Sequence, residues 1–249
     1  MAHRPPSSSS SPRFNGDHSH ASPAHPKVST EDDLPTLTLE LGGTLENHVY
    51  VLASDGTLGT RHQSDVAHIC VPGGEMDKVC AEVTQFLDSS DQFAVPKVLI
   101  AAGGLNLRIN STIIGGRMPL RYLLRNWSSI KRSTVKSVIQ PLYQVADRVQ
   151  QRGGQMMVAS VILPYASFSL KERLYVRLLS ECHQEINRAI HVQNHSRLGK
   201  TFCLAEKFHV RKSISGILRR GFHAEDGYNL KPAHQPRFMG KCINMLRSL

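Results

Sequence analysis

The sequence predicts a three-layer α/β/α domain with a mostly parallel central sheet, behind a disordered N-terminal tail. Short apolar runs alternate along the chain with longer segments whose apolar residues recur at helical spacing. The runs lack the polar–apolar alternation of half-exposed strands, which is typical of strands buried on both faces. Helix-sized connections of about a dozen residues or more let successive strands lie parallel, with helices covering both faces of the sheet.

The first 35 residues differ in composition from the rest of the chain. They contain a serine run at residues 7–11 and several prolines, and they have no apolar stretch. Prolines break helices, and so polar a segment cannot bury a core. We therefore expect a disordered tail over residues 1–35 and one domain over residues 36–249.

Signals for export are missing from the sequence. The tail does not have the apolar stretch of a secretory signal, and no run reaches the length of a membrane span. The five cysteines are widely spaced and include no C-x-x-C pair, which favours reduced thiols over a disulfide framework. These observations predict a cytoplasmic or nuclear protein.

The net charge points to an anionic partner as one option. The chain carries +10 overall, and its first 35 residues hold three cations against four carboxylates, so the domain holds +11. Two basic stretches cover residues 117–136 and 207–220. A basic surface suits nucleic acid, although few aromatic side chains are interleaved for base stacking.

The predicted elements follow one another in the order that a parallel sheet requires. Apolar runs predict strands at residues 49–53, 68–71, 97–102 and 156–163, with residues 201–204 as a candidate fifth. Helical spacing covers residues 76–87, 135–151, 170–192 and 235–246. The carboxyl ends of parallel strands meet at one edge, where functional groups gather, so the loops that follow the strands are the places to search.

These loops carry a recognisable series of residues. The first reads Ser54-Asp55-Gly56-Thr57, the second Pro72-Gly73-Gly74, the third Gly103-Gly104-Leu105-Asn106, and a C-terminal segment Asp226-Gly227-Tyr228-Asn229. In order and position, from about residue 47 to residue 245, the series resembles the SGNH (GDSL-type) hydrolases. That family has a Gly-Asp-Ser turn, a glycine turn, a Gly-x-Asn-Asp loop and a final Asp-x-x-His pair.

The resemblance implies a catalytic serine, a histidine base and an aspartate that orients it, with a glycine N–H and an asparagine amide stabilising the oxyanion. Four positions match: Asp55 in the first turn, Gly73 (or Gly74) in the second loop, Asn106 in the third, and Asp226 as the orienting acid. Two do not: Gly56 stands at the position of the nucleophile, and Asn229 stands at the position of the base.

The two missing side chains predict lost catalysis. Glycine offers no nucleophile, and an asparagine amide is not a base near neutral pH. We therefore expect a pseudoenzyme that acts as a binding or scaffold protein, with a small acyl or ester ligand as one candidate for a vestigial pocket. No metal or organic cofactor is implied, because the chemistry of the family needs none.

Two other interpretations stay open. In the first, the chain is a residual ester or acyl hydrolase that uses Thr57 or Ser54 as its nucleophile, with His223 or His234 as the base. In the second, the basic stretches bind nucleic acid weakly. Asn106 and Asp226 also have structural interpretations, as a turn asparagine and as a helix cap.

Overall fold

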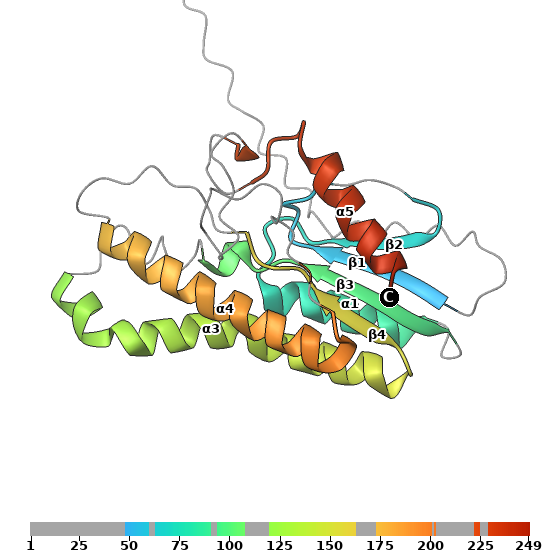
Figure 1. The fold of residues 1–249 in the computed structure, drawn as a ribbon, viewed down its shortest axis with the longest axis horizontal. Helices are drawn as coiled ribbons and strands as arrows, with labels where there is room; N and C mark the ends of the chain where they lie inside the picture. Colours follow the sequence, from blue (N-terminus) through green and yellow to red (C-terminus); the bar gives the residue numbers. More distant parts are fainter. Residues whose placement is uncertain are drawn as a thin grey trace, which may run out of the picture. The chain divides into compact units, whose positions relative to one another are not determined.

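The central element of the domain is a four-stranded parallel sheet (Figure 1). The computed structural model describes residues 48–59, 63–90, 94–107, 120–162, 173–200, 202, 222–224 and 229–249, so the predicted tail lies outside the described residues. The strand order is β2–β1–β3–β4, with bounds β1 His48–Ser54, β2 Val66–Cys70, β3 Val95–Ala101 and β4 Gln155–Val158. The register places Ser54 beside both Cys70 and Ala101, so the loops after the first three strands begin at one edge.

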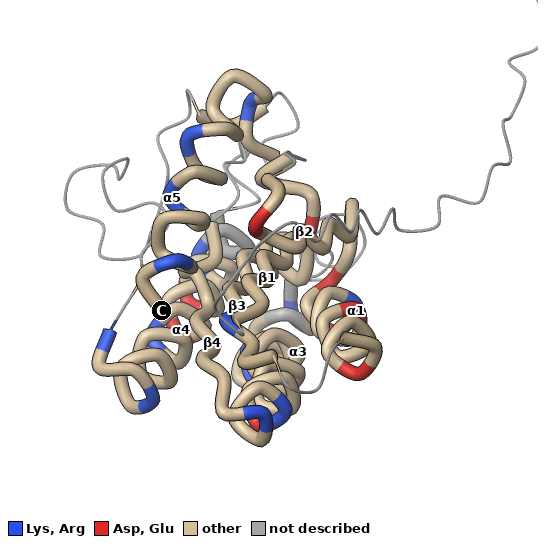
Figure 2. The backbone as a smooth tube through the Cα atoms, turned by 90° about the vertical axis from the view of Figure 1, so that its right-hand side faces the viewer, with Lys and Arg blue, Asp and Glu red and all other residues tan. Residues whose placement is uncertain are grey.

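Helices cover both faces of this sheet, which confirms the predicted three-layer architecture. Their bounds are α1 Met76–Ser89, α3 Leu120–Gln151, α4 Arg173–Leu198 and α5 Gln235–Arg247. Val51 and Ala53 pack into the core with α1, α3 and α4, whereas Leu52 between them packs into the core under α5. Figure 2 shows α5 on one side of the strands and α1 and α3 on the other.

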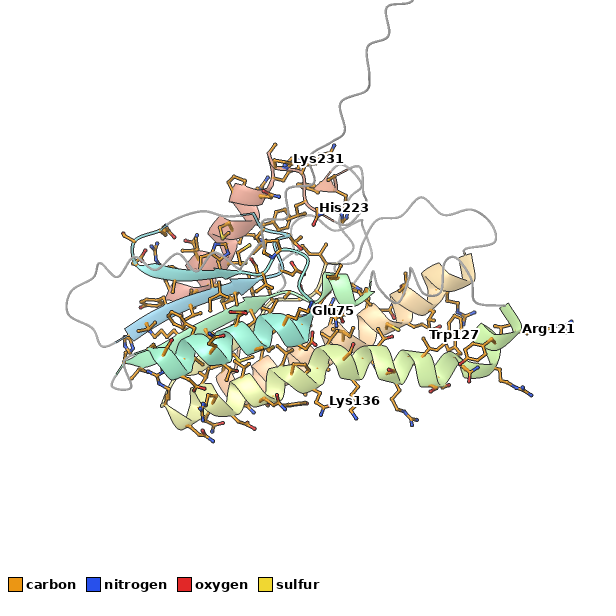
Figure 3. All side chains as sticks on the ribbon, turned by 180° about the vertical axis from the view of Figure 1, so that it is seen from behind. Glu75, Arg121, Trp127, Lys136, His223 and Lys231 are labelled. Carbon is orange, nitrogen blue, oxygen red and sulfur yellow. The ribbon has the colours of Figure 1, made fainter. Side chains whose placement is uncertain are left out.

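Helix α3 begins well before the expected position. The apolar spacing predicts a helix over residues 135–151, but the helix spans Leu120–Gln151. Its first half carries little apolar periodicity because it extends along α4 rather than over the sheet (Figure 3). Polar contacts hold this part: Trp127 Nε1 donates to Glu181 Oε2 at 2.9 Å, and Lys131 pairs with Glu185 at 2.7 Å.

Two further expectations change at the end of the sheet. Within the described part of the run at residues 156–163, the strand β4, Gln155–Val158, ends at Val158, and the Ala159 N–H makes one further hydrogen bond to β3, to the Ile100 carbonyl at 2.8 Å. Of the candidate fifth strand, residues 201–204, only Phe202 is described, and its carbonyl accepts the Ser160 N–H at 3.3 Å.

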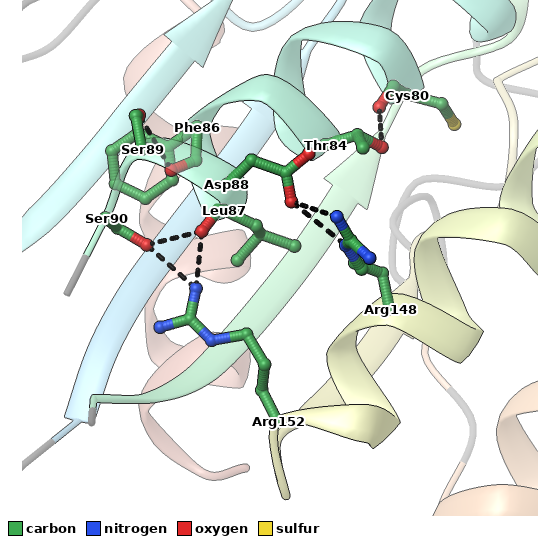
Figure 4. Close-up of polar contacts among 9 residues, drawn as sticks. All are labelled: Cys80, Thr84, Phe86, Leu87, Asp88, Ser89, Ser90, Arg148 and Arg152. Atoms are coloured by element: carbon green, nitrogen blue, oxygen red, sulfur yellow. Dashed lines mark hydrogen bonds and ion pairs between the residues drawn. The ribbon is translucent and has the colours of Figure 1, made fainter. Parts of the chain in front are cut away.

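Arg148 of α3 and Arg152, the residue that follows α3, fix the far end of α1 (Figure 4). Arg148 forms an ion pair with Asp88, with Nε 2.9 Å from Oδ1. Arg152 donates to the Leu87 carbonyl at 2.6 Å and to Ser90 Oγ at 2.9 Å. These charge-assisted bonds satisfy groups at the C-terminus of α1, where carbonyls lack partners within the helix.

Side chains of α4 cover the outer edge of β4. Asn194 pairs with both main-chain groups of Val158: its Oδ1 accepts the N–H at 3.1 Å and its Nδ2 donates to the carbonyl at 2.7 Å. Asn187 does the same for Val161, at 2.7 and 3.2 Å. The two amides thus act as the neighbour that this edge needs, because an unpaired strand edge exposes a row of donors and acceptors.

Candidate functional site

The first loop is built around a glycine that cannot easily be replaced. Gly56 follows β1 with φ of +85°, and its carbonyl accepts the Gly59 N–H at 3.0 Å, closing a tight turn. A Cβ at Gly56 would lie 3.0 Å from Pro72 Cα in the second loop. Both the left-handed backbone and this close approach favour glycine, so the turn presents no side chain at Gly56, the position where a nucleophile was expected.

Asp55 uses its carboxylate to hold loops together. The side chain is buried, and it accepts the Thr57 N–H at 3.2 Å and the Thr57 hydroxyl proton. Gly103 in the third loop adds a backbone hydrogen bond. Burial raises the pKa of Asp55, and the hydrogen bonds from Thr57 and Gly103 oppose that shift. Asp55 therefore links the first and third loops at the sheet edge.

The N–H groups of Gly73 and Gly74, the expected oxyanion donors, form hydrogen bonds within the main chain. Gly73 N–H donates to the Asp55 carbonyl at 3.2 Å, and Gly74 N–H donates to the Val71 carbonyl at 2.8 Å. Gly73 has φ of +68° and open space where a Cβ would be, whereas a Cβ at Gly74 would lie 2.6 Å from a Val71 methyl. The structure therefore places the second loop against the first, and the N–H groups of Gly73 and Gly74 are both bound to main-chain carbonyls.

Asn106 caps the N-terminus of α1, although it lies 30 residues after Met76 in the sequence. Its side chain is 1% exposed, and its Oδ1 accepts the N–H of Met76, the first residue of α1, at 2.9 Å. Its Nδ2 points to Glu75 Oε2 at 3.5 Å and to Ser137 Oγ at 3.4 Å. The preceding residue, Glu75, makes no side-chain cap itself, so Asn106 supplies the acceptor that the N-terminus of α1 requires.

A polar hollow of about 440 Å³ adjoins Asn106. Glu75 lies at the start of α1, close to the loops, as Figure 3 shows. The other lining residues are also mostly polar and come from α1 and α3: Asp77, Ser133, Lys136, Ser137, Gln140, Pro141 and Gln144. Such a lining favours a ligand that forms hydrogen bonds over an apolar acyl chain.

The C-terminal segment forms two short antiparallel pieces. Ala224 N–H donates to the Asn229 carbonyl at 2.8 Å, and His223 is bridged with Leu230. His223 is 3% exposed, whereas Asn229 is exposed to solvent. Asp226, the expected orienting acid, lies outside the described residues. The main chain of Asn229 thus has a structural role in this pairing.

The start of α5 lies next to the first loop. A Cβ at Gly59 would lie 2.4 Å from Gln235 Oε1, and Gln235 Nε2 donates to the Leu230 carbonyl at 3.2 Å. The ring of His234 packs on Phe222 with centroids 4.6 Å apart. The structure therefore brings the first, second and third loops and the C-terminal segment to one end of the domain.

One serine–histidine contact was not expected from the sequence. Ser54 Oγ lies 3.2 Å from His68 Nε2, within hydrogen-bond distance. Ser54 ends β1 and His68 lies in β2, two residues before Cys70, which is beside Ser54 in the register. Both side chains therefore point to the same face of the sheet. Ser54 is 0% exposed, so its hydroxyl has no access to a substrate.

The four cysteines of the described ranges, Cys70, Cys80, Cys182 and Cys242, are buried and free. Burial raises the pKa of Cys80 and Cys242 to about 12 and that of Cys182 to about 11, which keeps these thiols protonated and unreactive near neutral pH. Within the residues that the structure describes, no group of three His, Cys, Asp or Glu side chains is arranged to hold a metal ion. In the same part of the chain, no helix has the length and apolar character to cross a membrane.

Comparison with known proteins identifies the fold. No family model and no curated protein matches the sequence. Among solved structures, a GDSL-like lipase from Bacteroides thetaiotaomicron is similar with a TM-score of 0.53 and 14% identity, over 81% of this chain and 88% of that chain. A protein from Bacteroides fragilis described as an acylhydrolase gives a TM-score of 0.53 and 10% identity, over 84% and 90%.

The domain therefore has an SGNH (GDSL-type) hydrolase-like fold, as the order of its loops predicted. At these identities the likeness concerns the fold, because one such fold hosts many functions. What this chain does has to be argued from the side chains at the sheet edge.

Proposed function

We propose that this chain is a non-catalytic binding or scaffold protein built on an SGNH hydrolase fold. The observation that carries the proposal is the turn at Gly56, which takes the position of the nucleophile. Positive φ and the approach of Pro72 favour glycine there. A hydrolase of this class needs an exposed nucleophile on a tight turn. Gly56 has no hydroxyl, Ser54 is buried, and the half-buried Thr57 donates its hydroxyl proton to Asp55.

The rest of the candidate machinery supports the same proposal. The N–H groups of Gly73 and Gly74 are bound to main-chain carbonyls, and the amide Nδ2 of Asn106, the expected donor, points to Glu75 Oε2 at 3.5 Å and to Ser137 Oγ at 3.4 Å. Oxyanion stabilisation requires donors aimed at the place where charge develops. In this chain the corresponding groups stabilise the loops instead.

The contact between Ser54 and His68 is the best argument for the alternative, a residual ester hydrolase. A serine and a histidine within hydrogen-bond distance are the first elements of a nucleophile–base pair. Complete burial of Ser54 weighs against this role. Thr57, the other candidate nucleophile, donates its hydroxyl proton to Asp55. This hydrogen bond stabilises the turn after β1.

A hydrolysis assay separates the two functions. We expect the full chain to release nitrophenol from p-nitrophenyl acetate and p-nitrophenyl butyrate at the rate of protein-free buffer. The same rate is expected for Ser54→Ala and Thr57→Val. Ser129→Ala, which changes an exposed hydroxyl of α3, is the matched control.

Turnover above buffer in the wild-type chain that falls by about a hundredfold or more in Ser54→Ala or Thr57→Val, but not in Ser129→Ala, would establish the hydrolase instead. A drop of that size is typical of a lost triad nucleophile. Circular dichroism of each variant verifies that the fold is retained.

A further inference from the structure

Helix α3 presents a row of cations to solvent. Arg121, Arg125, Arg132 and Lys136 are all exposed. At 3.6 residues per turn they fall within about 60° around the helix axis, and at 1.5 Å per residue they extend over about 22 Å. Figure 3 shows Arg121 and Lys136 pointing away from the helix toward solvent. We call these four residues the α3 basic stripe.

The cations of the stripe are not held in ion pairs within the described ranges, although Lys136 shares the hollow beside Asn106 with Glu75 and Asp77. None of the four cations has an ion-pair partner in those ranges. Helix α3 holds no acidic residue before Asp147, which is paired with Arg197. Lys131, on a different side of α3, shows the contrast, because it is bound to Glu185 at 2.7 Å. Like charges held together without partners create a local positive field.

A groove with an aromatic wall lies beside the stripe. Its volume is about 660 Å³, and its lining includes Arg132, Lys136, Val135, Ile139 and Tyr143. The ion pair of Lys131 with Glu185 also lines the groove, and Lys131 offsets the charge of that carboxylate. Tyr143 is 49% exposed. On an ideal helix it would fall within the same sector of about 60° as the stripe, about 10 Å beyond Lys136, and Pro141 lies between the two residues. A cationic edge with an exposed ring is the combination that holds both a phosphate and a base.

We propose that the α3 basic stripe binds the phosphate backbone of single-stranded nucleic acid, with Tyr143 stacking on a base. Three of the four cations are arginines, whose planar donors match phosphate oxygens. This surface belongs to α3 and is independent of the loops at the sheet edge, so the proposal does not rest on the lost catalysis.

The composition of the stripe argues against two other anionic partners. A helix that lies on a membrane needs a continuous apolar face, but the exposed apolar residues near this end of α3, Tyr122 and Leu124, fall on opposite sides of the stripe. An acidic protein segment would not need the exposed ring of Tyr143.

Other basic residues noted in the sequence lie outside the described residues: Arg117 and the second basic stretch, residues 207–220.

Fluorescence anisotropy with labelled dT20 and U20 oligonucleotides tests the proposal on the full chain. We expect wild-type binding that weakens as salt rises. In the quadruple variant Arg121→Gln, Arg125→Gln, Arg132→Gln, Lys136→Gln, the slope of log K against log salt should fall by about 3, because each single-strand phosphate contact contributes about 0.7. Tyr143→Ala should weaken binding about tenfold without changing the slope.

The matched control removes four cations from other surfaces: Lys78→Gln, Lys97→Gln, Lys200→Gln and Lys231→Gln. It should leave the salt slope within about 1 of wild type. An equal loss of slope in the control, or an unchanged slope in the stripe variant, overturns the proposal. So does absence of oligonucleotide binding at low salt, including the case in which the protein binds phosphatidylserine vesicles or polyglutamate instead.

Discussion

Replacing Asn194 with leucine is expected to lower the free energy of unfolding by about 4 kcal/mol. Asn194 is 2% exposed and satisfies both the N–H and the carbonyl of Val158 at the outer edge of β4. Leucine has a similar size but cannot form either bond, and each buried group left without a partner costs about 1–3 kcal/mol. In a protein of this size the midpoint of thermal unfolding should fall by roughly 10 °C.

Urea unfolding, followed by circular dichroism, measures this loss directly. Asn126→Leu is the matched control, because Asn126 also lies on a helix and, among the described residues, its side chain forms one hydrogen bond, to the carbonyl of Tyr122. It should change the free energy of unfolding by less than about 0.5 kcal/mol. A similar small change in Asn194→Leu would show that the edge of β4 does not depend on the asparagine.

Introducing a serine at Gly56 is expected to destabilise the protein and to restore no hydrolysis. The left-handed backbone costs a side chain about 1–2 kcal/mol, and the new Cβ would lie 3.0 Å from Pro72 Cα. Together these effects predict a loss of about 2–4 kcal/mol in the free energy of unfolding.

Gly153→Ser separates the cost of the left-handed backbone from the cost of the contact with Pro72. Gly153 has a comparable φ of +68°, but no described residue lies within 4 Å of the place of its Cβ. This variant should therefore show the backbone cost alone, about 1–2 kcal/mol. If Gly56→Ser is no more destabilising than Gly153→Ser, or if it hydrolyses p-nitrophenyl acetate, the turn after β1 is more permissive than its geometry indicates.

The layered fold was predictable from the sequence because its signals are local. Apolar runs such as residues 97–102 mark buried strands, and helical spacing marks the helices that face the sheet. The first half of α3 was missed because its side chains contact α4 and solvent, so apolar spacing does not reveal it. Its exposed arginines were visible as a basic stretch, but only the helix aligns them into a stripe.

The candidate site was predictable in part, at the level of loops. Turn residues such as Gly56 and Gly73 indicate where strands end, and parallel pairing brings those ends together. Side-chain partners depend on register and on packing between distant segments. The contact of Ser54 with His68 required the pairing of β1 with β2, and the cap that Asn106 provides required the position of α1.

The absence of an accessible nucleophile in the first loop is tested most directly by covalent capture. The full chain would be incubated with a fluorophosphonate, which forms a bond with activated serine and threonine hydroxyls, and then measured by intact mass spectrometry. We expect no adduct, because Gly56 has no hydroxyl, Ser54 is buried, and Thr57 is bound to Asp55. A stoichiometric adduct that maps to Ser54 or Thr57, and that is lost on prior denaturation, would contradict the account.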